Sequence, residues 1–215
     1  MKEIKHIIFD MDGVIIDTEP EYKRRLKYFL EVKGYEVSDD LCNKTCGSSL
    51  KDAYRILKNE INNFDMSFEQ YVSEKRNILK NDIIDIRKVV DPEIYPLLEW
   101  LKVNGFSIAL ASSTLKERIM DNLSILNLKE YFDVIVSGMD FKRSKPDPKI
   151  YYYTINQLRI TPDKCLVVED STYGIEAAKL AGAIVIAKID NRFGYDQSKA
   201  DYKIEKLGEI IKLWN

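Results

Sequence analysis

Two aspartates separated by a single residue, Asp10 and Asp12, directly follow the apolar run Ile7–Phe9 near the start of the sequence. An apolar run rich in β-branched residues is typical of a buried strand, and ligands of open α/β sheets bind at the carboxyl ends of the strands. Gly13 comes next, and a glycine allows the backbone to turn sharply or to approach a ligand closely. The stretch therefore indicates either an acidic ligand site or the Asp-Gly turn of a β-hairpin.

Further polar side chains follow three later segments that are expected to be strands. They are Ser112 and Ser113 after the apolar run 106–111, Lys145 in the loop after 134–137, and Glu169 and Asp170 after 165–168. The carboxyl ends of parallel strands lie along one edge of a sheet, so we expect these groups to meet Asp10 and Asp12 there. The hairpin interpretation then loses most of its support.

The charges at this edge indicate its chemistry. Converging carboxylates repel one another unless a cation lies among them. A hard divalent ion with oxygen ligands, Mg²⁺, fits this requirement. The Ser112 hydroxyl and the Lys145 amine could hold the oxygens of an anion, so the set predicts a magnesium-dependent phosphate site. Taken singly, these residues could be a helix cap, a strand-end hydroxyl or a solvated lysine, but together they favour the site.

The elements that must position these residues alternate between strands and helices from about residue 85 to the end of the chain. Such alternation implies parallel βαβ units. Between residues 18 and 84 only helical patterns occur. We therefore expect an α/β fold, with a three-layer, Rossmann-like parallel sheet in a core domain of residues 1–17 and 85–215 and an inserted α-helical cap domain of residues 18–84.

Capping patterns predict where the helices begin. In the insertion, helices are expected at 21–33, from Ser49 to 61, and from Ser67 past 79. In the core, helices are expected to begin at Asp91-Pro92, at Thr114, at Asp147-Pro148 and at Ser171, and a last helix to end at Trp214. Further strands are expected at 183–187 and 202–204.

Composition excludes several other classes of protein. The 215 residues include 33 Lys and Arg and 35 Asp and Glu, a net charge of −2, which gives no electrostatic signal for nucleic acid or an anionic membrane. No apolar run approaches membrane-spanning length and no signal-peptide pattern occurs, so we expect a cytoplasmic protein. The single histidine, His6, begins the first strand, which argues against Ser-His-Asp, Cys-His and histidine-zinc chemistry. Cys42 and Cys46 could form half a metal site, but without further partners ordinary packing is favoured.

Four segments resemble, in order, the signature motifs of the haloacid dehalogenase superfamily. They are Asp10-Met11-Asp12-Gly13-Val14, Leu110-Ala111-Ser112-Ser113, Ser144-Lys145-Pro146-Asp147-Pro148, and Val168-Glu169-Asp170-Ser171 with Gly174. The helical insertion resembles the capped subfamily that contains β-phosphoglucomutase and many small sugar-phosphate phosphatases. The resemblance covers essentially the whole chain. It implies phosphoryl transfer, because the dehalogenating members lack the second aspartate of the first motif.

The resemblance also implies a role for each motif residue. Asp10 would be the nucleophile that becomes an aspartyl phosphate. Asp12 would protonate the leaving oxygen and then activate the incoming water or sugar hydroxyl. The phosphoryl group would be held by Ser112, Ser113, Gly13 and Lys145, and Mg²⁺ by Asp10, by Asp12 through its backbone carbonyl, by Asp170 and, as a ligand or behind the ligands, by Glu169.

Substrate choice is expected to depend on the insertion, where the chain departs from the β-phosphoglucomutase pattern. Tyr22 stands where the mutases have a histidine, and Gly47, a candidate pocket residue, precedes Ser48-Ser49-Leu50 where they have an arginine for the distal phosphate. Arg76 or Lys75 could supply that charge, but an exposed helix face is the favoured explanation of both residues. We therefore favour Mg²⁺-dependent hydrolysis of a small phosphate monoester, such as a sugar phosphate, over β-phosphoglucomutase-type isomerisation.

A non-catalytic alternative is a receiver-like phosphoacceptor module, which also uses an aspartate, Mg²⁺ and a lysine on a parallel α/β sheet. Such a module needs no cap, and this chain devotes residues 18–84 to one. The expected partner is a small-molecule phosphate ester, with no nucleic acid and no membrane, and the expected assembly is a monomer or a weak dimer.

Overall fold

The computed structural model describes residues 3–214, which form two compact units. The core unit contains the chain up to Asp17, Ile86–Asp190 and the chain from Tyr195 onward. The helical unit contains Thr18–Asp85 together with Asn191–Gly194. The boundaries expected from the sequence leave this last short loop in the core, whereas its contacts group it with the helices.

The core unit contains a six-stranded parallel sheet in the order β3-β2-β1-β4-β5-β6. Its strands are β1 (His6–Phe9), β2 (Ser107–Ser112), β3 (Val134–Ser137), β4 (Cys165–Glu169), β5 (Ile184–Lys188) and β6 (Tyr202–Ile204). The strands beside β1 are nearly all buried, which explains their continuous apolar runs. The expected Rossmann-like α/β fold is confirmed, and β1 has parallel neighbours on both sides, as a hairpin strand would not.

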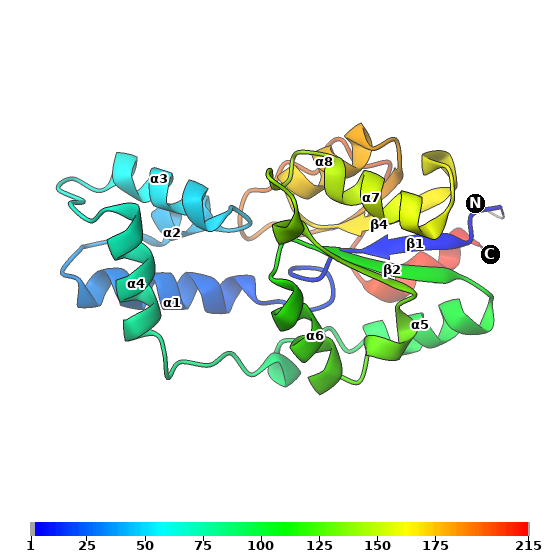
Figure 1. The fold of residues 1–215 in the computed structure, drawn as a ribbon, viewed down its shortest axis with the longest axis horizontal. Helices are drawn as coiled ribbons and strands as arrows, with labels where there is room; N and C mark the ends of the chain where they lie inside the picture. The colour runs from blue at the N-terminus through cyan, green and yellow to red at the C-terminus, as the bar shows by residue number, and fades with distance from the viewer. Residues whose placement is uncertain (1–2, 215) are drawn as a thin grey trace. The chain divides into compact units, whose positions relative to one another are not determined.

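Each face of the sheet has its own hydrophobic core. The helices of this unit are α5 (Ile94–Val103), α6 (Lys116–Ile125), α7 (Lys149–Leu158) and α8 (Thr172–Leu180). Because successive side chains of a strand point to opposite faces, Ile7 and Phe9 pack with α5 and α6, whereas Ile8 packs with α7 and α8. Figure 1 shows these two pairs of helices on opposite faces of the sheet. The last segment, η5 (Leu207–Leu213), joins the first of these faces as a 3₁₀ helix and not as the expected α-helix.

Two of the expected helix starts in the core unit are shifted toward the C-terminus. The Thr114 hydroxyl donates to Asp12 Oδ2 at 2.9 Å instead of capping a helix, and α6 begins two residues later. Asp91 accepts a hydrogen bond from the Glu93 backbone N–H at 3.0 Å, so its side chain closes a turn just before α5. In both cases the side chain that was expected to cap the helix makes a different hydrogen bond, and the helix begins further along the chain.

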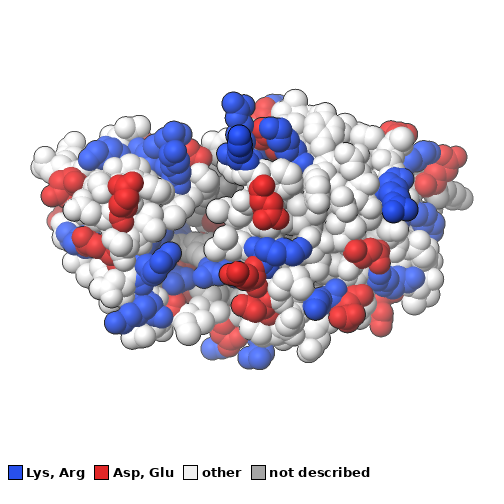
Figure 2. All heavy atoms as spheres, viewed as in Figure 1, with Lys and Arg blue, Asp and Glu red and all other residues white. Residues whose placement is uncertain are grey.

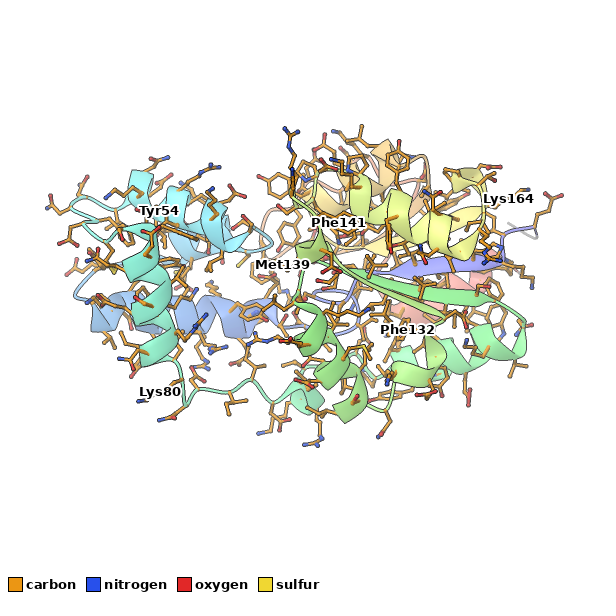
Figure 3. All side chains as sticks on the ribbon, viewed as in Figure 1. Tyr54, Lys80, Phe132, Met139, Phe141 and Lys164 are labelled. Carbon is orange, nitrogen blue, oxygen red and sulfur yellow. The ribbon has the colours of Figure 1, made fainter. Side chains whose placement is uncertain are left out.

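The helical unit consists of α1 (Glu19–Val32), α2 (Asp39–Thr45), α3 (Leu50–Glu60) and α4 (Phe68–Ile78). The capping box predicted at Ser67 is present, since Ser67 and Gln70 exchange side chain–backbone hydrogen bonds. Aromatic rings occupy the centre of this unit. Tyr54, labelled in Figure 3, lies 5.8 Å from the ring centroid of Tyr71, which in turn lies 5.7 Å from that of Phe29.

The two segments that lead to and from the helical unit are fastened together within the core unit. The Asp91 backbone N–H donates to the Ile15 carbonyl at 2.9 Å. At the end of β5, Lys188 Nζ donates to the Val14 carbonyl at 2.9 Å and pairs with Asp91 Oδ2 at 2.8 Å. One lysine therefore ties both segments to the sheet.

Basic and acidic side chains are interspersed on the face of the molecule shown in Figure 2. This mixture agrees with the near-zero net charge of the sequence. Within residues 3–214, the helices are all too short or too polar to cross a lipid bilayer.

Candidate active site

Asp10 lies at the carboxyl end of the central strand. Its backbone N–H donates to the Val168 carbonyl at 3.0 Å, so the pairing of β1 with β4 extends one residue beyond β1 and fixes the position of the aspartate. Its side chain is buried and ends beside Lys145, whose Nζ lies 2.5 Å from Asp10 Oδ1. The structure thus brings together two residues that are 135 positions apart in the sequence.

Lys145 bridges two carboxylates. Its Nζ lies 2.6 Å from Glu169 Oε1 as well as close to Asp10, and it lies over the ring of Tyr151, 5.1 Å from the centroid. The Lys145 side chain is only 8% exposed, and Glu169 is fully buried, so the pair is shielded from water. A buried charge needs such partners, because losing its hydration is costly.

Glu169 accepts hydrogen bonds at both of its oxygens. Oε1 accepts from Lys145 and, at 2.7 Å, from the Tyr151 hydroxyl. Oε2 accepts from the backbone N–H groups of Asp170 and Ser171 at 3.0 and 3.2 Å and from the Ser171 hydroxyl at 3.1 Å. Both oxygens of this carboxylate are therefore occupied by hydrogen bonds, and Oε1 holds the Lys145 amine.

The charges of these groups depend on one another. Burial raises the pKa of Asp10 to about 8, against the opposing effect of Lys145. Burial also raises the pKa of Glu169, but the Lys145 charge and the hydrogen bonds outweigh it and hold the pKa below its usual value. Burial lowers the pKa of Lys145, while the two carboxylates hold it well above the usual value. Lys145 therefore stays charged and Glu169 ionised.

Asp12 faces the end of β2. Its Oδ2 accepts hydrogen bonds from the Thr114 hydroxyl at 2.9 Å and from the Ser112 hydroxyl at 3.4 Å, and Ser112 Oγ in turn accepts from the Thr114 backbone N–H at 3.1 Å. Ser112 is buried, whereas Ser113 is exposed. Thr114 is a site residue that the sequence pattern missed, because a Thr two residues before a helix is ordinarily explained as a cap.

Gly13 gives the Asp170 carboxylate room to approach the loop that follows Asp12. A Cβ built on Gly13 would lie 2.1 Å from Asp170 Oδ2, and the residue has φ +81°, which favours glycine. Gln197 holds the backbone of Asp170 in place, because its Nε2 donates a hydrogen bond to the Asp170 carbonyl at 2.6 Å. No pattern in the sequence marks Gln197, which lies in a polar loop, or Tyr151, which lies in a helix.

The acidic groups at this edge offer oxygen ligands of the kind that Mg²⁺ prefers. Within the part of the chain that the structure describes, no three or more His, Cys, Asp or Glu side chains are grouped as a metal site. Three hard oxygen donors could hold the ion together with water or substrate, namely the carboxylates of Asp10 and Asp170 and the Asp12 backbone carbonyl. The close approach of Asp170 to the Gly13 backbone supports this set.

Two of the expected pocket residues lie in the helical unit. The Gly47 backbone N–H donates to Glu19 Oε1 at 3.3 Å, and Arg76 is exposed on α4. Neither residue takes part in the contacts given above for the core site. Cys42 is buried in the same unit, and burial raises the pKa of its thiol, which agrees with packing rather than metal binding.

Comparison with known proteins gives a consistent result. Residues 7–188 match the family model of haloacid dehalogenase-like hydrolases. A protein of Thermotoga maritima named phosphorylated carbohydrates phosphatase is 35% identical over 178 residues, which cover 82% of this chain and 81% of that protein. The phosphoglycolate phosphatase of Aquifex aeolicus is 31% identical over 210 residues, 96% of this chain and 95% of the relative.

A solved structure extends the similarity to the whole fold. The crystal structure of a putative β-phosphoglucomutase from Thermotoga maritima superimposes with a TM-score of 0.72 at 30% identity and covers 98% of both chains. The matched region includes the sheet edge with Asp10, Lys145 and Asp170 as well as the helical unit.

Proposed function

This chain belongs to the haloacid dehalogenase-like hydrolases, and from this membership and its site we propose that it hydrolyses a small phosphate monoester of the sugar-phosphate class. The observation that carries the proposal is the arrangement at the end of β1, where Lys145 joins the nucleophile candidate Asp10 to the buried Glu169. The similarity to phosphatases that act on phosphorylated carbohydrates and phosphoglycolate supports hydrolysis of a small ester.

In the first step, an oxygen of the Asp10 carboxylate attacks phosphorus. The bond from phosphorus to the alcohol oxygen breaks, and Asp12 donates a proton to the leaving oxygen. In the second step, ionised Asp12 takes a proton from water, the water oxygen attacks phosphorus, and the aspartyl phosphate releases inorganic phosphate. Two steps through a covalent intermediate replace one more difficult step. The hydroxyls of Thr114 and Ser112 orient Asp12 for both proton transfers.

The charge of the transferred group is balanced mainly by positioned cations and hydrogen-bond donors. Lys145 supplies one of them and is held in place by Glu169 and Tyr151. The Ser112 hydroxyl supplies a donor. We propose that Glu169 orients Lys145 and is not a metal ligand, because hydrogen bonds occupy both of its oxygens.

Mg²⁺ would be held by the carboxylates of Asp10 and Asp170 and by the Asp12 backbone carbonyl. When bound, the ion would favour the ionised form of Asp10, whose pKa burial raises to about 8, and would neutralise negative charge on the phosphoryl group. Gly13 leaves the space that the Asp170 carboxylate needs, and Gln197 fixes the Asp170 backbone.

The helical unit, Thr18–Asp85, is proposed as a cap that selects the substrate and excludes water from the core site. The similarity to a putative β-phosphoglucomutase keeps isomerisation as the second candidate. In the sequence, Tyr22 stands where the mutase pattern has a histidine, and Ser48-Ser49-Leu50 stands where it has an arginine, which favours hydrolysis.

The decisive experiment measures phosphate release from p-nitrophenyl phosphate and from a panel of sugar phosphates, with Mg²⁺ and with EDTA. Release is expected only with Mg²⁺ and should fall on the order of 10³-fold or more in Asp10→Asn. Asp163→Asn, an exposed position, serves as the control and should keep full activity. Formation of glucose 6-phosphate from β-glucose 1-phosphate, dependent on the bisphosphate, would show a mutase, and a protein phosphorylated once without turnover would show a receiver-like module.

A further inference from the structure

The helical unit contains a pocket between α1 and α2, called here the α1–α2 pocket. It encloses about 480 Å³, a volume typical of sites for small molecules. Its lining consists of Pro20, Lys23, Arg24 and Lys27 of α1, Asp39 and Asn43 of α2, and Arg192 and Phe193. All of these residues belong to the helical unit, because Asn191–Gly194 is grouped with it. The residues expected to select the substrate, Tyr22, Gly47 and Arg76, are not part of this lining.

The α1–α2 pocket carries an excess of positive charge. Lys23 and Lys27, one turn apart on α1, share one carboxylate, since their Nζ atoms lie 3.1 and 2.7 Å from the two oxygens of Asp39. The Asp39 side chain is 60% exposed, and exposed ion pairs contribute little to stability. Arg24 is already paired with two acids outside the lining, whereas Arg192 adds a further positive charge. An anion in the pocket could therefore compete with Asp39 for both amines at small cost.

Phe193 and Pro20 give the same pocket an apolar surface. The guanidinium of Arg192 lies over the Phe193 ring, 5.0 Å from its centroid. Aromatic rings and guanidinium planes are surfaces on which the planar groups of ligands stack. An inorganic anion would leave this surface unused. The lining therefore favours an organic anion that has a planar ring.

The side chain of Asn43 adds a hydrogen-bonding group that lacks a partner. Its Oδ1 is buried and accepts no hydrogen bond from the described residues. A buried acceptor without a donor is unfavourable. Rotation of the side-chain amide would turn Oδ1 toward the pocket that Asn43 lines, where an amino or hydroxyl group of a ligand could donate to it. A solvated helix surface explains the lysines of α1, but it explains neither this amide nor the pocket.

We propose that the α1–α2 pocket binds an organic anion of the size of a mononucleotide, with a planar ring and hydrogen-bond donors. Lys23 and Lys27 hold its anionic group, Phe193 stacks on its ring, and Asn43 accepts a hydrogen bond from it. This ligand is distinct from the substrate of the core site, and the proposal does not rest on the function proposed above.

The experiment titrates the full chain with adenosine monophosphate (AMP) in EDTA and measures the dissociation constant by calorimetry. Adenosine lacks the charge and ribose 5-phosphate lacks the aromatic ring, so each should bind at least about tenfold more weakly than AMP. Lys27→Met and Phe193→Leu should each raise the Kd for AMP about tenfold, through loss of a charged hydrogen bond and of the stacking surface. Lys44→Met is the matched control, because Lys44 is an exposed residue of α2 that pairs with Glu60 outside the pocket, and it should leave the Kd unchanged.

A variant of the core site, Lys145→Met, distinguishes the pocket from that site and should bind AMP as tightly as the unaltered chain. A Kd raised in Lys145→Met but not in Lys27→Met would place AMP in the core site and overturn the proposal. Equal Kd values in Lys27→Met, Phe193→Leu and Lys44→Met would overturn it too, as would equal affinity for AMP and ribose 5-phosphate or the absence of saturable AMP binding. Circular dichroism checks the fold of each variant, and Lys23→Met tests the same pair of amines if Lys27→Met does not fold.

Discussion

The carboxylate of Glu169 occupies the space that a side chain at position 174 would need. A Cβ built on Gly174 would lie 1.8 Å from Glu169 Oε1 and 2.2 Å from Oε2. The glycine lies in the first turn of α8, so the helix can begin directly against the carboxylate whose Oε1 holds Lys145. The motif glycine is therefore required by the packing of its helix, not by a turn.

Gly174→Ala is expected to lower kcat on the order of 10²-fold, because the methyl group must displace Glu169 and with it Lys145. Alanine has the higher helix propensity by about 1 kcal/mol, so a loss of activity cannot be attributed to a weaker helix. Steady-state kinetics with p-nitrophenyl phosphate measure the effect. Glu176→Ala on the same helix removes only an exposed ion pair with Lys199 and should leave kcat unchanged. Full activity in Gly174→Ala would show that the position of Glu169 is not important.

Thr114→Val is expected to lower kcat about tenfold with little change in KM, since the valine keeps the shape but cannot donate to Asp12. Thr114→Ser restores the hydroxyl and should recover most of the activity. A change in KM alone, or no recovery with serine, would contradict the assigned role of orienting Asp12.

The sequence predicted the strands of the core and the residues at their carboxyl ends, because buried parallel strands require continuous apolar runs. It did not predict the roles of Thr114, Tyr151 and Gln197, which reach Asp12, Glu169 and Asp170 through tertiary contacts. The first of these contacts spans 102 positions and leaves no local pattern. The sequence also did not predict helix α2. This helix has only seven residues and buries only Leu41, Cys42 and Thr45, so its apolar pattern is too short to be recognised.

In metal-free protein, Asp10→Asn is expected to be more stable than the unaltered chain by an amount that grows as the pH rises from about 4 to about 8. The sign follows from the pKa of Asp10, which burial raises from its ordinary value of 3.8 to about 8. Stability conferred by the protonated carboxyl is complete below the unfolded-state pKa and is lost as the pH rises through the folded-state pKa. Urea unfolding in EDTA measures the difference, which should exceed about 1 kcal/mol at pH 8. Added Mg²⁺ should stabilise the unaltered chain more than Asp10→Asn, and a difference independent of pH would refute the assignment.

Lys188→Met is expected to destabilise the core unit by about 1–3 kcal/mol, between the values typical of exposed and of buried ion pairs. The substitution leaves Asp91, whose side chain is 19% exposed, without its cation and the Val14 carbonyl without its donor. Lys164→Met is the matched control, because Lys164, labelled in Figure 3, pairs with the exposed Glu3 at 2.7 Å. Its loss should cost less than about 1 kcal/mol. Urea unfolding followed by circular dichroism compares the two variants. Equal stability of the two variants would show that Lys188 does not fasten this loop.

Lys188→Met should also reduce kcat, because Val14, whose carbonyl Lys188 holds, follows Asp12 and Gly13 in the catalytic loop.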